Sequence, residues 1–367
     1  MGYWWKFLSV ALLLFASIAA LRTPLAPALV HATPDRLATG TTAITITGYN
    51  TSFTSDHQVY LINSKERLCA GRVEIIAPNM IKATFNIASA PKEALSSIVV
   101  HHPEKGRLGL PEALFHPSTG EGWGDTGCTS ALAGTIGAGE FNFPNRSILY
   151  ETIRNLNFHV PMWFTMMALM GLSLVHSLIG LNRNSLAHDR SAAVAVKVGL
   201  LFCALGLITG SIWARTTWGG WWTNDVKLNG AAVTALIYLA YLVLRGSVQD
   251  PGRRARLSAV YNIFAFIMLL LFLMILPRLN AIDSLHPGSG GNPAFDQYDL
   301  DDNLRMVFYP AVAGWIMLGL WIFQLGDRTE RLREKLLDRE FASEIRPMAQ
   351  RSPIGTSHVD INPHGSR

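Results

Sequence analysis

Two histidines and a run of tryptophans have the residue types and spacing to bind a flat, metal-containing ligand. His159 opens a His-Val-Pro sequence, His286 precedes a Pro-Gly pair, and Trp218, Trp221 and Trp222 lie between them. Neutral imidazole is a standard ligand of haem iron. Indole rings offer a flat apolar surface, and in a helix the i, i+3 and i+4 spacing would place all three rings on one face. Together these residues favour a haem site. Taken singly, the histidines are ordinary interfacial or loop residues and the tryptophans an aromatic belt at a membrane surface.

Apolar runs dominate the second half of the chain and must position these residues. Hydrophobic residues account for 49% of the 367 residues and charged residues for 16%, against about 25% charged in ordinary soluble domains. This composition argues against a wholly soluble enzyme. Six apolar runs occur. One near the start, Trp4–Leu21, fits either a signal peptide or a short membrane anchor. The other five have lengths close to the roughly 20 residues needed to cross a membrane: Val160–Leu181, Ala192–Ala214, Leu228–Leu244, Leu257–Pro277 and Met306–Leu325.

Basic segments alternate with segments that are less basic, and this alternation predicts the orientation in the membrane. Residues 183–190, 245–256 and 328–335 hold clusters of Arg and Lys, which the positive-inside rule places in the cytoplasm. The segments that then face outward are 22–158, 215–227 and 278–305. Both histidines and the tryptophans are therefore expected on the same outer side. Membrane topology also accounts for the net charge of +5, so no nucleic-acid partner is expected.

Residues 31–118 form a soluble insert that is expected to be an all-β, immunoglobulin-like sandwich. β-branched residues recur between Gly, Pro and Asn at sandwich-like spacing, and Pro34–Asn50 is similar to the opening of a TIG-type domain. The expected strands are 43–48, 58–62, 72–76, 81–87 and 97–101. Residues 119–146 are expected to be a Gly-rich linker, and residues 340–367 a polar, disordered cytoplasmic tail.

The cysteines and the histidines of the insert suggest little chemistry. Cys69 and Cys128 are candidates for a disulfide in an oxidising exterior, although their spacing does not give their distance. No C-x-x-C-H sequence occurs, so the chain is not itself a c-type cytochrome. His101, His102 and His116 could bind a metal, but they are expected to be incidental surface histidines.

Three motifs in order give the chain a resemblance to a known family. Arg154–Pro161, Trp218–Asp225 and Leu285-His286 resemble the haem-handling proteins of cytochrome c maturation, the CcmC-type members of the CcmC/CcsA superfamily named for its "WWD" segment. The resemblance covers residues 3–22 and 147–335. It implies a six-helix membrane protein with a retained first helix and a five-helix haem-handling domain at 147–335; the insert is not part of the usual pattern.

The resemblance also implies roles for individual residues. His159 and His286 would be the axial ligands of haem b, Trp218, Trp221, Trp222 and Asp225 would contact the porphyrin, and Arg154 would pair with a propionate. Arg215 and Lys227 are further candidates for the propionates. Two departures weaken the detail: the family often has another Trp at the position of Asn224, and it has an Arg at the position of Lys227, where a lysine cannot form the bidentate carboxylate pair.

The implied function is delivery of haem to a periplasmic haem chaperone at the bacterial inner membrane. The partners implied are an ATP-binding subunit of the ABC type and small membrane proteins of the maturation system. The chain has no P-loop, H-E-x-x-H or nucleophile elbow, so energy for haem movement must come from a partner, and no enzymatic activity is expected.

Two alternatives stay open. One is a cytochrome c synthase of the CcsA class, which attaches haem to C-x-x-C-H apoproteins. That class resembles a channel with additional histidines inside the membrane, whereas here His176, about 25 Å deeper than His159, is expected to lack a partner histidine because His188 lies in a cytoplasmic loop. The other alternative is a solute transporter or an adhesion protein.

The predicted orientation can be tested with reporter fusions. A reporter that is active only in the periplasm should be active when fused after Gly290 and silent when fused after Arg254, because the positive-inside rule places these loops on opposite sides. The reverse pattern would overturn every assignment to the outer face.

Overall fold

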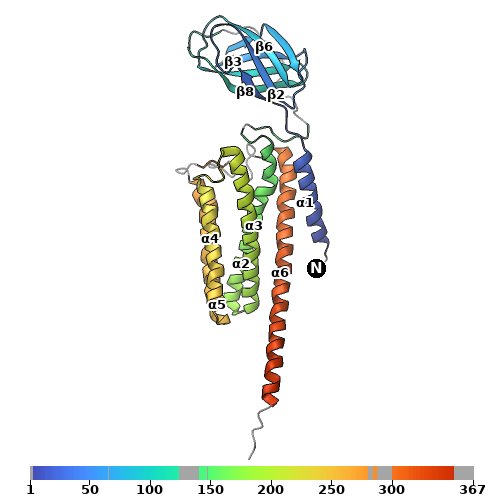
Figure 1. The fold of residues 1–367 in the computed structure, drawn as a ribbon, viewed down its shortest axis with the longest axis vertical. Helices are drawn as coiled ribbons and strands as arrows, with labels where there is room; N and C mark the ends of the chain where they lie inside the picture. Colours follow the sequence, from blue (N-terminus) through green and yellow to red (C-terminus); the bar gives the residue numbers. More distant parts are fainter. Residues whose placement is uncertain are drawn as a thin grey trace, which may run out of the picture.

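The computed structural model describes six long helices and a β domain that projects from one end of the helical bundle (Figure 1). The described residues are 3–64, 66–123, 140–146, 148–279, 284–286 and 300–350, with side chains of the last stretch described as far as residue 340. All six helices are long and apolar enough to cross a membrane. The prediction of six spans with an inserted all-β domain is confirmed; Cys128 and Gly290 lie outside the described residues.

The helices cover the predicted apolar runs and extend beyond them. Their bounds are α1 (Trp4–Arg22), α2 (Leu156–Arg183), α3 (Leu186–Trp218), α4 (Val226–Ser247), α5 (Pro251–Leu270) and α6 (Asp302–Gln350). A 3-10 turn, η1 (Tyr150–Asn155), leads into α2, while a π-helical turn, η2 (Leu271–Ile275), and a 3-10 turn, η3 (Leu276–Arg278), prolong α5. The start of α2, the connection between α3 and α4, and the end of η3 lie at the end of the bundle that carries the β domain, called here the β-domain end (Figure 1).

The first helix is an integral part of the bundle. Ser9 Oγ donates a hydrogen bond to the carbonyl of Gly314 on α6 at 3.0 Å. A Cβ on Gly314 would lie 3.1 Å from the side chain of Leu13, so glycine permits the close approach of the two helices. Ala16 and Ala20 are buried at the same interface. This packing favours the interpretation of residues 3–22 as a membrane helix over a signal peptide.

The last helix projects beyond the bundle at the far end (Figure 1). It continues to Gln350, so the part of the predicted tail between residues 340 and 350 is helical, because Glu, Ala and Arg favour a helix. Lys197 on α3 pairs with Glu330 on α6 at 2.9 Å. Residues 351–367 lie outside the described residues.

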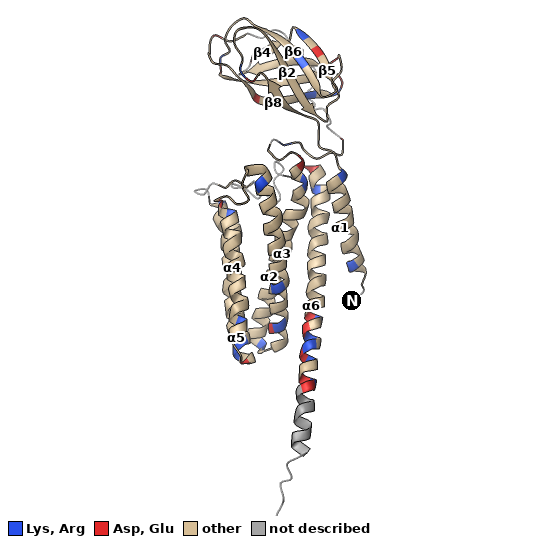
Figure 2. Cartoon of the chain, viewed as in Figure 1, with Lys and Arg blue, Asp and Glu red and all other residues tan. Residues whose placement is uncertain are grey.

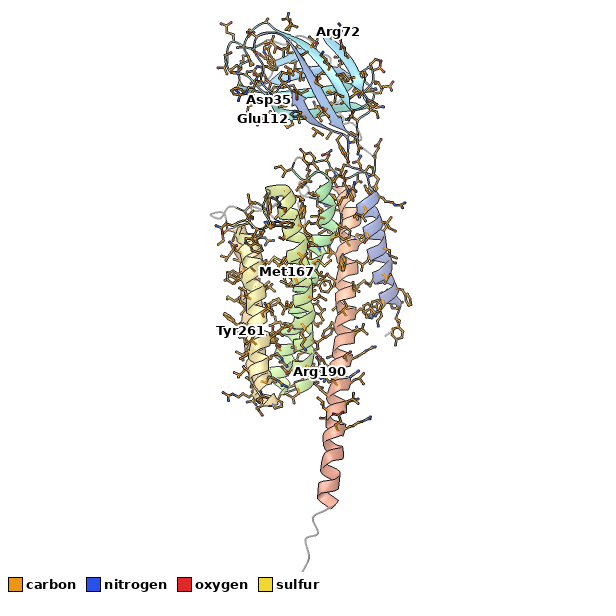
Figure 3. The ribbon with its side chains drawn as sticks, in the orientation of Figure 1. Asp35, Arg72, Glu112, Met167, Arg190 and Tyr261 are labelled. Carbon is orange, nitrogen blue, oxygen red and sulfur yellow. The ribbon has the colours of Figure 1, made fainter. Side chains whose placement is uncertain are left out.

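Basic side chains gather at the far end of the bundle, the end predicted to be cytoplasmic (Figure 2). Figure 3 shows Arg190 at this end, whereas Met167 and Tyr261 lie between the two ends. Arg245 on α4 forms two hydrogen bonds to Asp189 on α3, at 2.5 and 2.9 Å. This bidentate pair joins two helices where the clusters of Arg and Lys were predicted.

The β domain is a sandwich of two antiparallel four-stranded sheets. Its strands are β1 (Ala28–Thr33), β2 (Gly40–Tyr49), β3 (Gln58–Asn63), β4 (Glu66–Cys69), β5 (Arg72–Ala77), β6 (Met80–Ile87), β7 (Leu95–His102) and β8 (Gly106–Phe115). The sheet orders are β1-β2-β6-β5 and β4-β3-β7-β8. These orders correspond to the A-B-E-D and C′-C-F-G sheets of an immunoglobulin fold, as the sequence predicted.

The strands that were predicted from the sequence include those that contribute alternating apolar residues to the core of the sandwich. Ile44 and Ile46 on β2 alternate into the core opposite Leu61 on β3, and Phe85 on β6 is fully buried. β1, β4 and β8 were not predicted, because β4 is only four residues long and Gly and Pro interrupt the β-type pattern of β8. The domain begins with β1 at Ala28 rather than at residue 31.

Two details of the β domain differ from or extend the expectations. His101, His102 and His116 are buried, with 3%, 7% and 2% of their surfaces exposed, so they are not surface histidines. The described residues hold no cluster of three or more His, Cys, Asp or Glu suited to a metal. Cys69 is disulfide-bonded, which agrees with an oxidising exterior; its pairing with Cys128 stays a prediction.

The buried histidines predict a pH dependence of the β domain's stability. Burial lowers the pKa of His57 and of His116 below the ordinary value, which is about 6.5. The folded domain then binds fewer protons than the unfolded chain at acidic pH. Its stability should be fully present above about pH 6.5 and should decrease as the pH falls further.

We expect the domain, expressed as residues 24–139, to fold alone and to show a melting temperature that falls between pH 7 and pH 5 by circular dichroism. His57→Asn retains an acceptor for the amide of Thr54 and should flatten this dependence. His31→Asn, on an exposed position of β1, is the matched control. A melting temperature that does not change with pH in the unmodified domain would contradict the prediction.

Candidate functional site

Three segments meet at the β-domain end of the bundle. They are the first turns of α2 with His159, the tryptophan segment (Trp218–Asp225) between α3 and α4, and the histidine loop (residues 284–286) beyond η3. His159 and His286 lie close enough that a positive charge on the second imidazole would disfavour one on the first. The structure therefore brings the two predicted histidines together.

Glycines of α3 make room for the aromatic side chains of α2. A Cβ on Gly210 would lie 2.6 Å from Cε1 of His159, and a Cβ on Gly206 would lie 2.9 Å from the ring of Trp163. Both distances are shorter than real carbon contacts, so any larger residue would displace the rings. His159 and Trp163 are one turn apart on α2, as Gly206 and Gly210 are on α3. Two successive turns of the helices thus fit together at the site.

Thr209 fixes the tautomer of His159. Its Oγ1 lies 3.1 Å from Nδ1 of His159 and donates its own proton to the carbonyl of Leu205 at 2.8 Å. The hydroxyl then accepts a hydrogen bond from Nδ1–H, and the carbonyl of Gly206 is a second hydrogen-bond partner of the imidazole. Trp213 packs edge-on against the imidazole, with ring centroids 5.8 Å apart, and its indole donates to Oγ1 of Thr152 at 3.0 Å.

Asp225 ends the tryptophan segment and caps α4. Its carboxylate accepts hydrogen bonds from the amides of Lys227 at 2.8 Å and Leu228 at 3.3 Å, which are free donors of the first helical turn. The residue is only 2% exposed. A buried carboxylate is stable only when hydrogen bonds satisfy it, and the helix supplies two of them.

The same carboxylate holds the histidine loop in place. Ser284 Oγ donates to Oδ2 at 2.8 Å, the amide of Leu285 donates to Oδ2 at 2.7 Å, and Nδ1 of His286 lies 3.0 Å from Oδ1. Burial raises the pKa of Asp225, but the hydrogen bonds from His286 and Ser284 outweigh burial and the pKa is lowered. The carboxylate is therefore ionised and accepts a hydrogen bond from Nδ1–H of His286.

The two histidines consequently present the same atom. In each ring Nδ1 carries the proton and is engaged, by Thr209 at His159 and by Asp225 at His286. The carbonyl of Gly206 is a further hydrogen-bond partner of the His159 imidazole. An imidazole whose Nδ1 is engaged can offer its Nε2 to a metal centre, and carboxylate–histidine pairs are a common arrangement around metals.

The tryptophan segment is not helical, so the expected shared face of its three rings does not form. α3 ends at Trp218, and Gly219 continues in the left-handed region with φ +78°, which terminates the helix. Trp218 packs edge-on against His286, with centroids 5.0 Å apart. Trp221 and Trp222 project into solvent, 61% and 47% exposed, and remain available to a ligand or a membrane surface.

Arg154 is engaged at the junction of the bundle and the β domain. Its guanidinium donates to Glu151 at 2.6 Å and to the carbonyls of Ala20 and Thr23 at 2.7 and 2.6 Å. Glu151 also accepts a hydrogen bond from the hydroxyl of Tyr49 on β2. These contacts give Arg154 a structural role, and its predicted interaction with a propionate stays a prediction.

His176 has a partner histidine, contrary to the expectation from the sequence. Its Nδ1 lies 2.9 Å from Nδ1 of His188, with ring centroids 5.2 Å apart. His188 was assigned to a loop, but α3 begins at Leu186, so the residue lies in the first turn of that helix and faces α2. The pair lies at the far end of the bundle, away from the site.

Several residues of the site were missed in the sequence. Thr209, Trp163, Trp213 and Ser284 act through contacts between separate segments, which no local pattern reveals. The repeated small residue at Gly206 and Gly210 was the one available signal, because small residues four apart favour close packing of membrane helices.

Comparisons with known proteins show that the helical part of the chain is similar to known membrane proteins of cytochrome c maturation. A family model described as "CcmC: Heme exporter protein C" matches residues 126–344. "Heme exporter protein C" of Paracoccus denitrificans is 30% identical over 185 residues, which are 50% of this chain and 76% of the relative. The protein of that name from Rhodobacter capsulatus is 28% identical over 199 residues, 52% of this chain and 78% of the relative. "Cytochrome c biogenesis protein CcsA" of Prochlorococcus marinus (strain MIT 9303) is 41% identical over 73 residues, 20% of this chain and 23% of the relative.

The close contact between Gly210 and His159 predicts the effect of a methyl group added at position 210. Gly210→Ala should displace the imidazole and break its hydrogen bond to Thr209, because the added carbon would lie 2.6 Å from Cε1. Nitrogen-15 NMR of histidine-labelled protein should show a changed Nδ1 signal of His159.

The matched control is Gly246→Ala on α4, where an added Cβ meets nothing within 4 Å. Both substitutions replace a helical glycine by alanine, which favours the helix. The steric contact would be disproved by an unchanged His159 signal in Gly210→Ala.

Proposed function

The chain belongs to the Heme exporter protein C (CcmC) family, and from this premise we propose that it holds haem b between His159 and His286 and passes it to a periplasmic haem chaperone. The family gives the chain a role in haem handling for cytochrome c maturation, in delivery rather than in catalysis. It also makes the chain a multi-pass inner-membrane protein that works with other subunits.

The paired histidines carry this proposal. Haem supplies an iron that takes axial imidazole, a large apolar plane and two propionates. Nδ1 of each histidine is engaged by Thr209 or Asp225, so each ring can offer its Nε2 to the iron. The donor set therefore fits haem.

The other residues of the site have separate tasks. Trp218 packs against His286 and limits the movement of its ring, while the exposed indoles of Trp221 and Trp222 provide apolar surface for the porphyrin. Asp225 is buried and acts through His286 rather than by contact with the porphyrin. Arg215, in the last turn of α3 and exposed, is a cation for a propionate, and Arg154 and Lys227 are the other candidates.

Exposure of the site suits release of its cargo. Trp221 and Trp222 keep about half or more of their surfaces in solvent, so a chaperone can reach haem from the β-domain side. The disulfide at Cys69 supports a periplasmic location for this side. The chain has no nucleotide-binding motif, so we assign the energy for haem movement to an ABC-type ATP-binding subunit acting with small membrane partners.

A cytochrome c synthase of the CcsA class is the second candidate. Two observations favour it: the match to CcsA proteins over 73 residues, and the contact between His176 and His188, which supplies the partner histidine that the sequence did not reveal. A second haem at that pair would make the synthase the better assignment.

Substitution of the histidines tests the proposed ligands. His159→Ala with His286→Ala should abolish the haem spectrum of the purified protein and block loading of the chaperone, because the iron loses both axial imidazoles. The pyridine haemochrome assay gives the haem content. His176→Ala is the control and should leave spectrum and content unchanged.

Retention of the normal haem content and spectrum in the double variant would refute the ligand assignment. Loss of a second haem in His176→Ala alone would establish the synthase alternative.

A further inference from the structure

The partners of the two histidines differ in charge. Nδ1 of His286 faces the carboxylate of Asp225 at 3.0 Å, and this carboxylate is buried. Nδ1 of His159 faces the neutral hydroxyl of Thr209 at 3.1 Å. Hydrogen bonds to an ionised acceptor are roughly twice as strong as those between neutral groups, and a carboxylate on Nδ1 raises the basicity of Nε2.

Both imidazoles are held in place by their neighbours, so the two histidines do not differ in how well their positions are fixed. The imidazole of His159 packs directly against Gly210, and Trp213 packs edge-on against the same ring. His286 is fixed through Asp225, which also accepts hydrogen bonds from Ser284 and Leu285. The two sites therefore differ mainly in the charge behind the imidazole.

We propose that Asp225 is a positioning residue that makes His286 the strong iron ligand, and that His159 is the ligand that leaves first when haem departs. The inference rests on the proposed function, since it assumes that both histidines bind the iron. His286, in the loop after η3, would still hold the haem after His159 has dissociated. The face of the haem that His159 vacates would then be accessible to the incoming acceptor. His159 would give up the iron to a ligand of the incoming acceptor, an exchange of one ligand for another that needs no change in oxidation state.

Carbon monoxide identifies the labile ligand. It binds reduced haem in place of one axial imidazole, and the Fe–C and C–O stretching frequencies then report electron donation by the imidazole that remains. If His159 leaves, the remaining ligand is His286, and Asp225→Asn should shift these frequencies in the direction of weaker donation. Thr209→Val should leave them unchanged.

Ser284→Ala is the matched control for structural loosening. It removes a hydrogen bond to Asp225 but keeps the negative charge, whereas Asn at position 225 keeps an oxygen that can cap α4. The frequencies in Ser284→Ala should stay at the wild-type values. In addition, the affinity for ferric haem should fall about 10- to 100-fold in Asp225→Asn, the range usual for loss of such a partner, and far less in Thr209→Val.

Three results would overturn the proposal. A shift in Thr209→Val without a shift in Asp225→Asn would make His286 the labile ligand. Unchanged frequencies in Asp225→Asn, or an equal shift in Ser284→Ala, would show that the charge of Asp225 does not act on the iron. Failure of the proposed function itself is recognised separately, because wild-type protein would then lack the spectrum of haem with two histidine ligands before any carbon monoxide is added.

Discussion

The burial of the Asp225 carboxylate is the constraint on which the site depends. Because an ionised carboxylate out of water needs several donors, its five hydrogen bonds must come from whatever segments surround it. They come from the first turn of α4 and from the histidine loop. One side chain thus fixes where α4 begins, where the tryptophan segment ends and where the imidazole of His286 lies.

The position of His159 at the same site depends on helix packing rather than on a buried charge. Its position is set by close packing between α2 and α3, where Gly206 and Gly210 admit the rings of Trp163 and His159. Membrane helices associate through such packing because lipid supplies no hydrophobic driving force between them. One histidine is therefore positioned by shape and the other by charge, and the proposed difference between them as iron ligands rests on that charge.

The sequence predicted the features that depend on local pattern. Apolar runs located the helices, alternating β-branched residues located most strands of the sandwich, and the order of motifs pointed to His159 and His286. It did not predict contacts between distant segments. A helix would have placed Trp218, Trp221 and Trp222 on one face, yet Gly219 ends α3. Likewise, the start of α3 brings His188 to His176, and the roles of Asp225 and Arg154 became visible only through their partners.

The most direct test of the account is the structure of the haem-loaded protein in a lipid bilayer, determined by cryo-electron microscopy. The account predicts haem at the β-domain end, with its iron within coordination distance of Nε2 of His159 and of His286, Nδ1 of His286 still against Asp225, and the porphyrin against the tryptophan segment. Haem bound between His176 and His188, or an iron coordinated by neither His159 nor His286, would contradict it.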